Sequence, residues 1–341
     1  MEVFVATPTD PPTHWARSLA IAVGAAVAVT LIVLAFLWPV ATASAKDIPL
    51  AVVGDPAAVA QVEDGLAKNA DGVFAPTTSD SRDAAIDAIE RREVYGAVVT
   101  GQQPEVLLAT AASPAVATAL RGVAQGLQAQ VSAQLAAMGQ NPTAVAVTVT
   151  DVVPLVDADP NGAGIVAIGF PLVLGGLAGG ILISLLVTGV ARRITALVVY
   201  AAAAGTAVTL IAHTWFGILP GDALPLIAGN ALAMLGTASF IVGLNALIGP
   251  PGIAVGAVTT MLIGNPLSAT SMPVQFLAAP WGGVGQFFVP GASATLIRDL
   301  GYFPAADTTQ PWLVLAAWAL VGVVLSVIGH WRNREVVHLA E

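Results

Sequence analysis

Apolar residues occur along most of the chain in long runs that short polar turns separate. The first run, Ser18–Trp38, has 21 residues, and a helix needs about 20 to cross a bilayer. Further runs follow after residue 163, and we expect spans at Ile165–Val190, Ile194–Phe216, Leu224–Ile248, from Gly252–Ile263 onward, and at Trp312–Trp331. The pattern predicts an α-helical integral membrane protein with about six transmembrane helices.

One polar stretch, residues 46–162, predicts an α/β domain inserted between the first and second transmembrane helices. Its apolar segments are short and are bounded by turn residues, as is typical of strands. We expect strands at Ile48–Val53, Gly72–Ala75, Tyr95–Thr100, Glu105–Ala109 and Ala144–Thr150, and helices at Ala57–Lys68, Asp80–Arg92 and Pro114–Met138.

The helix expected at Pro114–Met138 carries one apolar stripe with three- and four-residue spacing. Its members are Val116, Leu120, Val123, Leu127, Val131, Leu135 and Met138. Packing on the domain's own sheet explains the stripe most simply. A contact with a second protein chain, or with lipid, is the alternative.

The segment 264–300 is apolar but broken by prolines at positions 266, 273, 280 and 290. Proline removes a backbone donor and interrupts a helix. Irregular backbone at membrane depth is tolerated only where protein or a water-filled cavity surrounds it. We therefore expect two short re-entrant helices here, which a hydropathy count could misread as a further span.

Charge is scarce and unevenly placed. Only 10% of the residues are charged and the mean hydropathy is +0.83, whereas soluble domains carry about 25% charged residues. Residues 46–160 hold 6 basic and 14 acidic side chains, so they account for −8 of the net charge of −9. This acidic balance argues against a nucleic-acid partner. The chain has no cysteine, so it has neither a disulfide nor a thiolate metal site.

Basic residues set the expected orientation, because they favour the cytoplasmic side. With a cytoplasmic N-terminus, the inner segments carry Arg17, Arg192, Arg193, Arg332 and Arg334, and the outer loops of the membrane domain carry only Arg298. We therefore expect a multi-pass protein of the cell (cytoplasmic) membrane. Its parts are a cytoplasmic N-terminus (1–17), the first transmembrane helix (18–45), an extracytoplasmic domain (46–162), a five-helix membrane domain (163–331) and a cytoplasmic tail (332–341).

A cleaved signal peptide is the alternative interpretation of the first apolar run. Ala41-Thr-Ala and Ala43-Ser-Ala resemble signal-peptidase sites. The apolar region of a signal peptide spans only about 7–15 residues, however, and a basic segment precedes it. The run here is longer, and Glu2 and Asp10 precede it together with Arg17. We therefore expect a retained helix.

The sequence offers no recognisable catalytic chemistry. It lacks a Walker A motif, HExxH and GxSxG, so we expect no enzyme activity, cofactor or metal in this chain. The expected spans contain no charged residue, which argues against an ion-coupled carrier. Their notable polar residues are His213, Asn230 and Asn245. Interhelical hydrogen bonds explain these three better than substrate contact does.

The run Gly175-Gly-Leu-Ala-Gly-Gly180 on the second expected span favours close helix packing. Packing within one chain is the simpler interpretation, and a dimer interface is the alternative. Pro171 in the same helix predicts a kink.

Two local motifs carry a resemblance to a known family. In the polar domain, Ala84–Val99 forms a helix and a strand with the motif Tyr95-Gly-Ala. In the membrane domain, a more specific series of breaks runs through Gly264, Asn265, Pro266, Ser268, Pro273, Pro290, Gly291 and Arg298. Together with the order of elements, the motifs resemble permease subunits of type-2 ABC exporters, in particular the phage-infection-protein-like branch.

The resemblance implies a permease that dimerises with itself or with a related permease and works with a separate ATPase subunit. It implies export of an amphipathic or lipid-like substrate, and ATPase docking near Arg17, Arg192 and Arg193. This chain departs from the family in its very short cytoplasmic segments. A non-transporting membrane scaffold, an accessory of a secretion or envelope machine, is the alternative function.

Overall fold

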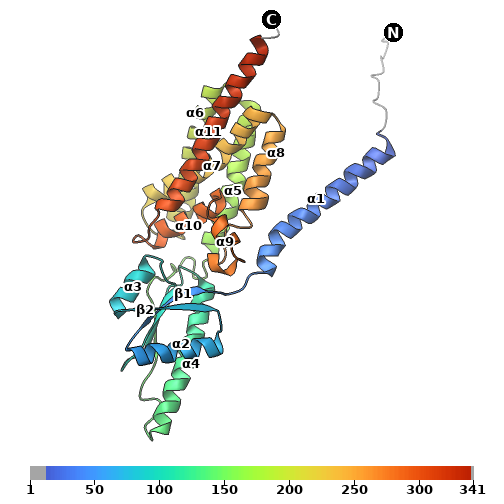
Figure 1. Ribbon diagram of the computed structural model, residues 1–341. Helices are drawn as coiled ribbons and strands as arrows, with labels where there is room; N and C mark the ends of the chain where they lie inside the picture. The colour runs from blue at the N-terminus through green and yellow to red at the C-terminus, as the bar shows by residue number, and fades with distance from the viewer. Residues whose placement is uncertain (1–12, 339–341) are drawn as a thin grey trace, which may run out of the picture.

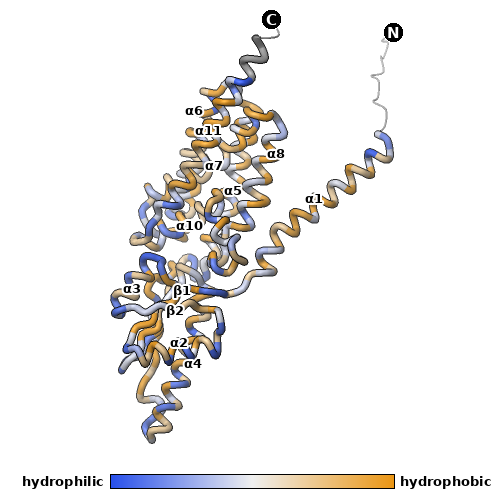
Figure 2. The backbone as a smooth tube through the Cα atoms, in the orientation of Figure 1, coloured by the Kyte–Doolittle hydropathy of each residue, from blue (hydrophilic) through white to orange (hydrophobic). Residues whose placement is uncertain are grey.

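The computed structural model describes residues 13–338 of the chain, with side chains up to Arg332. The ends of both predicted cytoplasmic segments, residues 1–12 and 339–341, lie outside the described residues. The structure is mostly helical and has one small sheet, which follows the first helix in sequence and lies at one end of the helical bundle (Figure 1). Figure 2 shows that the helices above the sheet are largely hydrophobic. The predicted class, a helical membrane protein, is therefore supported.

The sheet contains five short strands in the order β2-β1-β3-β4-β5. These are β1 (Ile48–Val53), β2 (Phe74–Ser79), β3 (Gly96–Val99), β4 (Glu105–Leu108) and β5 (Thr148–Asp151). All neighbours pair in parallel except β3 and β4. We call the sheet and its three helices, residues 48–151, the sheet unit.

The strand expected from residue 144 begins only at Thr148, and the side chain of Gln128 supplies the reason. Its Nε2 donates to the carbonyl of Val145 at 3.1 Å, and its Oε1 accepts from the backbone N–H of Val147 at 2.7 Å. Because this side chain binds the backbone groups before β5, they do not join the sheet.

The three helices of the sheet unit are α2 (Pro56–Asn69), α3 (Arg82–Glu90) and α4 (Pro114–Ala137). Each begins at a side-chain cap, because Asp55, Ser81 and Ser113 accept a hydrogen bond from the first turn. Successive strand residues point to opposite faces. Accordingly Ala51 packs on the α3 side, whereas Leu50 packs with α2 and α4.

The apolar stripe of α4 has two different environments. Val116 and Leu120 are buried against the sheet, as the simpler interpretation predicts. The helix then continues past the sheet (Figure 1), and at its end Met138 is 64% exposed. Only the first half of the stripe is therefore explained by the sheet.

The bundle is built around α7 (Ala223–Ile248). The helical segments that pack most extensively against α7 are α5 (Ala163–Leu186), α6 (Val190–Thr209), α8 (Pro251–Ala257) and α11 (Thr309–His338). Helix α6 continues as the π-helical η1 (Leu210–Trp215), and α8 continues as η2 (Val258–Gly264). Helices α7 and α11 run parallel, since Gly236 lies against Leu315 and Gly243 against Gly322.

The glycine run of α5 produces close packing within the chain. A side chain at Gly176 would meet Thr237, and one at Gly180 would meet Ala238 and Ile241, all on α7. A side chain at Gly179 would overlap the ring of Tyr200 on α6. The run therefore lies at α5–α6 and α5–α7 contacts of one chain, as the simpler interpretation predicts.

Among the described residues, five helices are long and apolar enough to cross a membrane: α1 (Trp15–Ala41), α5, α6 with η1, α7 and α11. The span expected from residue 252 is the shorter helix Pro251–Gly264. Its 14 residues extend about 21 Å at 1.5 Å per residue, less than the hydrocarbon core of about 30 Å. The predicted count of six spans is therefore not confirmed.

The segment after η2 consists of short pieces, η3 (Val274–Phe276), α9 (Trp281–Gly285) and α10 (Val289–Tyr302). Pro290 stands at the start of α10, where the missing N–H of proline is harmless. The proline-broken helical pattern expected for 264–300 is thus present, and we call these residues the broken segment. These pieces lie at the end of the bundle that faces the sheet unit (Figure 1).

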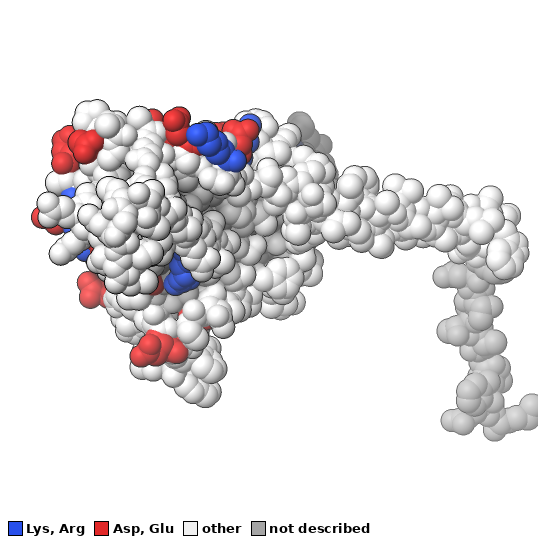
Figure 3. All heavy atoms as spheres, turned by 90° about the horizontal axis from the view of Figure 1, so that it is seen from below, with Lys and Arg blue, Asp and Glu red and all other residues white. Residues whose placement is uncertain are grey.

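Helix α1 stands apart from the bundle along most of its length (Figure 1). None of its most apolar 18-residue window is buried, whereas half of the corresponding window of α7 is. Its C-terminal end is held, because Trp38 meets the ring of Trp281 edge-on at 6.3 Å and Ser44 N donates to the carbonyl of Phe276. Viewed from below the sheet unit, the visible side of α1 shows no charged side chain, and acidic side chains lie at the edges of the rest of the molecule (Figure 3).

Candidate functional site

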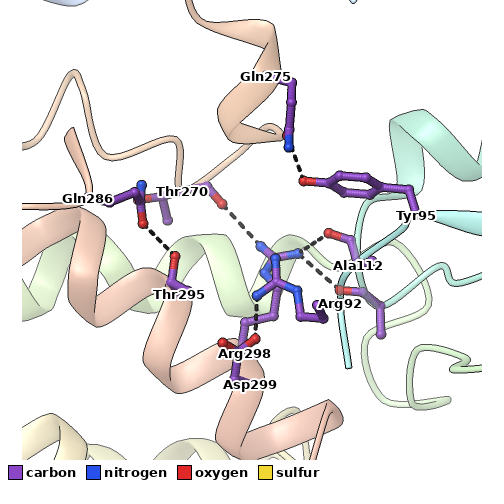
Figure 4. Close-up of polar contacts among 10 residues, drawn as sticks. Arg92, Tyr95, Ala112, Thr270, Gln275, Gln286, Thr295, Arg298 and Asp299 are labelled. Atoms are coloured by element: carbon purple, nitrogen blue, oxygen red, sulfur yellow. Dashed lines mark hydrogen bonds and ion pairs between the residues drawn. The ribbon is translucent and has the colours of Figure 1, made fainter. Parts of the chain in front are cut away.

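The sheet unit and the bundle share one hydrophobic core. Ile89 of α3 and Ala111 after β4 belong to the same buried cluster as Leu226 of α7 and Phe303 after α10. The two parts are therefore packed against each other, and polar side chains cross between them at α10. We call this contact the junction (Figure 4).

Arg298 of α10 binds both sides of the junction. One guanidinium nitrogen donates to the carbonyls of Ala111 and Ala112 in the sheet unit, at 3.1 Å each. The other donates to the carbonyl of Thr270 in the broken segment, at 3.2 Å. Burial lowers the pKa of this guanidinium to about 10, so it stays charged at neutral pH. One side chain thus fixes three backbone groups from two parts of the molecule.

Asp299, the next residue of α10, forms an ion pair with Arg92 at the end of α3. The carboxylate is almost fully buried, and Arg92 also lies over the ring of Phe303 at 5.3 Å. Burial raises the pKa of Asp299, and the charge of Arg92 offsets part of that rise. Removing one partner of such a pair leaves an uncompensated charge in a poorly solvated place.

Three further hydrogen bonds extend the junction into the broken segment. The hydroxyl of Tyr95 donates to Gln275 Oε1 at 3.0 Å, and burial raises the pKa of this tyrosine. Thr295 of α10 donates to Gln286 Oε1 at 2.7 Å, and Gln286 Nε2 donates to the carbonyl of Ser268. The broken segment is therefore bonded to the sheet unit and to itself.

Most of the predicted re-entrant residues form turns or allow close packing of the backbone. The hydroxyl of Ser268 donates to the carbonyl of Asn265 at 2.7 Å and closes the turn after η2. A side chain at Gly264 would meet Phe288 and Pro290, and one at Gly291 would overlap the carbonyl of Gly285. Pro266 lies in the turn after η2, and Pro273 precedes η3. Arg298 is the one member of this set whose side chain reaches the sheet unit.

The predicted polar span residues do not form a common site. Asn230 is buried, and its Nδ2 donates to Thr209 Oγ1 on α6 at 3.0 Å, as expected of an interhelical hydrogen bond. His213 Nδ1 lies 2.7 Å from the carbonyl of Leu219 and holds the turn after η1. Asn245 is half-buried near the opposite end of α7.

The three arginines expected to dock an ATPase differ in exposure and in hydrogen bonding. Arg17 and Arg192 are exposed. Arg193 is occupied, because it donates to the carbonyls of Val187 and Ser184 at 2.7 and 3.0 Å and so caps the end of α5. Arg192 and Arg193 lie at the end of the bundle away from the sheet unit.

Sequence reasoning found Arg298 but missed Arg92 and Asp299. Asp299 offered a signal, because it follows Arg298 directly after 75 residues without a charged side chain. The sequence contains no signal for Arg92. It is separated from Asp299 by 207 positions, and it looks like an ordinary charged residue just after an exposed helix.

The junction holds the sheet unit against the broken segment and α10. The described residues hold no group of three His, Cys, Asp or Glu side chains that could bind a metal ion. Comparisons with protein-family models, curated proteins and solved structures gave no match to this chain. The fold alone defines the class: a multi-helix membrane protein whose small α/β unit is fastened to one end of the bundle.

Proposed function

We propose that this protein is the permease subunit of an ABC-type exporter that moves an amphipathic or lipid-like substrate with energy from a separate ATPase. The junction is the observation that carries the proposal. Arg298 and Asp299 attach the sheet unit to the broken segment at one end of the bundle. A motion of that segment would therefore be passed to the sheet unit, as substrate release outside the membrane requires.

The orientation in the proposal places the sheet unit outside the cytoplasm. Arg192, Arg193 and Arg332 lie at the bundle end away from the sheet unit, and basic residues favour the cytoplasmic side. Because α7 and α11 run parallel, the chain between them must return across the bundle. We assign this return to α8, η2 and the residues after them, so that the tail is cytoplasmic and six crossings result.

The lack of charge in the bundle supports an external energy source. The five candidate spans contain acidic or basic residues only at their ends, and ion-coupled carriers use charged groups within the bundle. Helix α1 supports a dimer, with a second copy or a related permease, because it lacks contact with its own bundle over most of its length.

Co-purification from the native membrane in mild detergent tests the proposal. We expect an ATPase subunit to accompany the protein, and its ATP hydrolysis to rise in the complex. The charge reversal Arg192→Glu should weaken this association, whereas Arg91→Glu on the exposed surface of the sheet unit should not. An ATPase that never co-purifies, or whose association is unaffected by Arg192→Glu, would contradict the proposal.

The projecting end of α4 favours a second candidate, a non-transporting scaffold of a secretion or envelope machine. Met138 is exposed there on a helix that extends beyond its own sheet. A scaffold should lose its partner when Met138 is replaced by serine, and it should carry no ATPase. A permease should keep its ATPase in the same variant.

A further inference from the structure

The face of the sheet unit that points away from the bundle carries an open groove. It lies between α2 and α4 and has a volume of about 860 Å³. The sheet explains its origin, because α2 packs on β1 and β2 whereas α4 packs on β4 and β5. The central strand β3 is left between the two helices, and Val98 of β3 lines the groove.

The groove is apolar inside and polar at its rim. Its interior is lined by the aliphatic and aromatic side chains Val62, Leu66, Val73, Phe74, Val98, Val123 and Leu127. Gln61, Asp64, Lys68 and Gln130 stand among its polar residues. Small-molecule sites typically have this composition and volumes of about 300–1,000 Å³.

Three glycines keep the groove open. Gly65 of α2 and Gly122 and Gly126 of α4 line it, and a side-chain carbon added at any of them would have no neighbour within 4 Å. The bundle glycines behave differently, since added carbons at Gly176 or Gly243 would overlap a neighbouring helix. The groove glycines thus leave space that no described residue fills.

One end of the groove is close to the segments that come from the membrane. The carbonyls of Gly72 and Val73 accept hydrogen bonds from Asp47 and Ile48, where the chain arrives from α1. Phe276 of the broken segment packs against the same hydrophobic cluster that forms the floor of the groove. An apolar chain that leaves the bundle at this end therefore has a short path to the groove.

We propose that this groove binds the alkyl chain of an amphiphile whose headgroup carries no net negative charge. The volume of about 860 Å³ lies within the range of small-molecule sites, and the end of the groove near Val73 and Phe276 gives an alkyl chain a short path from the bundle. The charge of the whole domain disfavours an anionic headgroup, since residues 46–160 carry a net charge of −8 and repel anions, whereas the charged residues Asp64 and Lys68 that line the groove balance each other. For the substrate class, this inference rests on the proposed export function.

Photolabelling of the full-length chain in lipid nanodiscs tests the proposal. The probe is a phosphocholine with a single alkyl chain that bears a diazirine, and its partner probe has the same chain and a sulfate headgroup. We expect saturable labelling of the peptides around residues 61–74 and 119–130 by the phosphocholine probe, at least fivefold above labelling by the sulfate probe. Labelling of the membrane helices serves as the internal standard.

Filling the groove supplies the decisive variant. Gly122→Leu with Gly126→Leu should reduce groove labelling at least fivefold and leave labelling of the membrane helices unchanged. Leucine is a better helix former than glycine, so α4 should stay folded. The matched control is Ala129→Leu with Ala133→Leu, which adds three carbons at each of two exposed positions of α4 outside the groove, against four carbons at each glycine. The control should label like the parent protein.

Three results would overturn the proposal. The first is that the groove is labelled no more than the rest of the sheet unit. The second is that labelling persists in the filled variant. The third is that both probes label the groove equally. A change in oligomeric state on filling, measured by light scattering and unaccompanied by a change in labelling, would instead make the groove a protein interface. None of these measurements involves an ATPase, so failure of the groove and failure of the export function can be told apart.

Discussion

Helices α1 and α7 are alike in length and apolar character, yet they have opposite environments. They contain 27 and 26 residues, and the mean hydropathies of their most apolar windows are 2.8 and 1.9. None of that window is buried in α1, whereas half of it is buried in α7. Hydropathy therefore identifies a candidate span without showing whether the span packs against its own chain.

Regularly spaced glycines and buried polar residues mark the difference between the two helices. Helix α7 carries Gly229, Gly236 and Gly243 at seven-residue intervals, together with buried Asn230 and Thr237. Glycines let helix backbones approach closely in membranes, and polar residues form bonds between helices. Helix α1 is rich in alanine but has a single glycine, Gly24, with no neighbour nearby. The spacing of glycines and the presence of buried polar residues, rather than total hydrophobicity, thus distinguish the central helix.

The largest effect should come from filling the close contact between α7 and α11. Any side chain at Gly243 would overlap the carbonyl of Gly322, and overpacking of this kind costs about 3 kcal/mol. We therefore expect Gly243→Ala to lower the free energy of unfolding in mixed micelles by about that amount. The matched change Gly24→Ala in α1 should be nearly neutral. Equal effects of the two substitutions would refute the contrast between the helices.

The junction should give the next largest effect. Asp299→Ala leaves Arg92 without its partner, and breaking a buried pair costs about 3–5 kcal/mol. Because about a fifth of the Arg92 side chain is exposed, we expect Asp299→Ala to lower the free energy of unfolding by only about 2 kcal/mol. The measurement is a double-mutant cycle with Arg92→Ala. Additive effects would mean that the two charges do not interact, and that the sheet unit is held by the shared hydrophobic core alone.

The sequence indicated most elements of the fold because each has a local signal. The strand at Ile48–Val53 was predicted with its observed bounds, and the helix at Arg82–Glu90 was predicted slightly too long. The start of β5 was wrong because a distant side chain, Gln128, binds the preceding backbone. The span count was uncertain because the length of the helix ending at Gly264 depends on how the next segment packs.

The junction was only partly predictable, because some of its signals are local in sequence and others depend on how distant parts of the chain pack. The proline and glycine breaks around Arg298 are local, and they marked an unusual segment. That Arg298 binds the carbonyls of Ala111 and Ala112 depends on the docking of a unit 186 residues away in sequence. The groove could not be foreseen either, because Gly65, Gly122 and Gly126 look like ordinary weak points of two exposed helices until the structure places them around one space.

A smaller effect should follow from the polar contact between α6 and α7. Thr209→Val removes the acceptor of Asn230 Nδ2 and keeps the shape of the side chain. Asn230 Oδ1 has no hydrogen-bond partner within the described part of the chain, so the variant would leave both polar atoms of the asparagine unpaired. Interhelical hydrogen bonds contribute about 0.6 kcal/mol on average in membranes. We expect Thr209→Val to lower the free energy of unfolding by about 1 kcal/mol in mixed micelles.

The control for this contact is Thr259→Val on η2, where the threonine hydroxyl bonds only to the carbonyl of its own helix, at Val255. That variant should stay within about 0.3 kcal/mol of the parent, because no interhelical bond is lost. If the two threonine variants behave alike, the contact between Thr209 and Asn230 contributes nothing specific to the stability of the bundle.

The smallest effect should distinguish the two ends of α1 itself. Trp38 meets Trp281 edge-on, and such aromatic pairs contribute about 0.5–1.5 kcal/mol. Since Trp38 is 38% exposed, we expect Trp38→Ala to lower the free energy of unfolding by about 0.5 kcal/mol. Val29→Ala, at an exposed position in the middle of α1, should have no measurable effect in a monomer. A clear loss for Val29→Ala that grows with protein concentration would instead show that a second chain covers α1, because only an intermolecular contact depends on concentration.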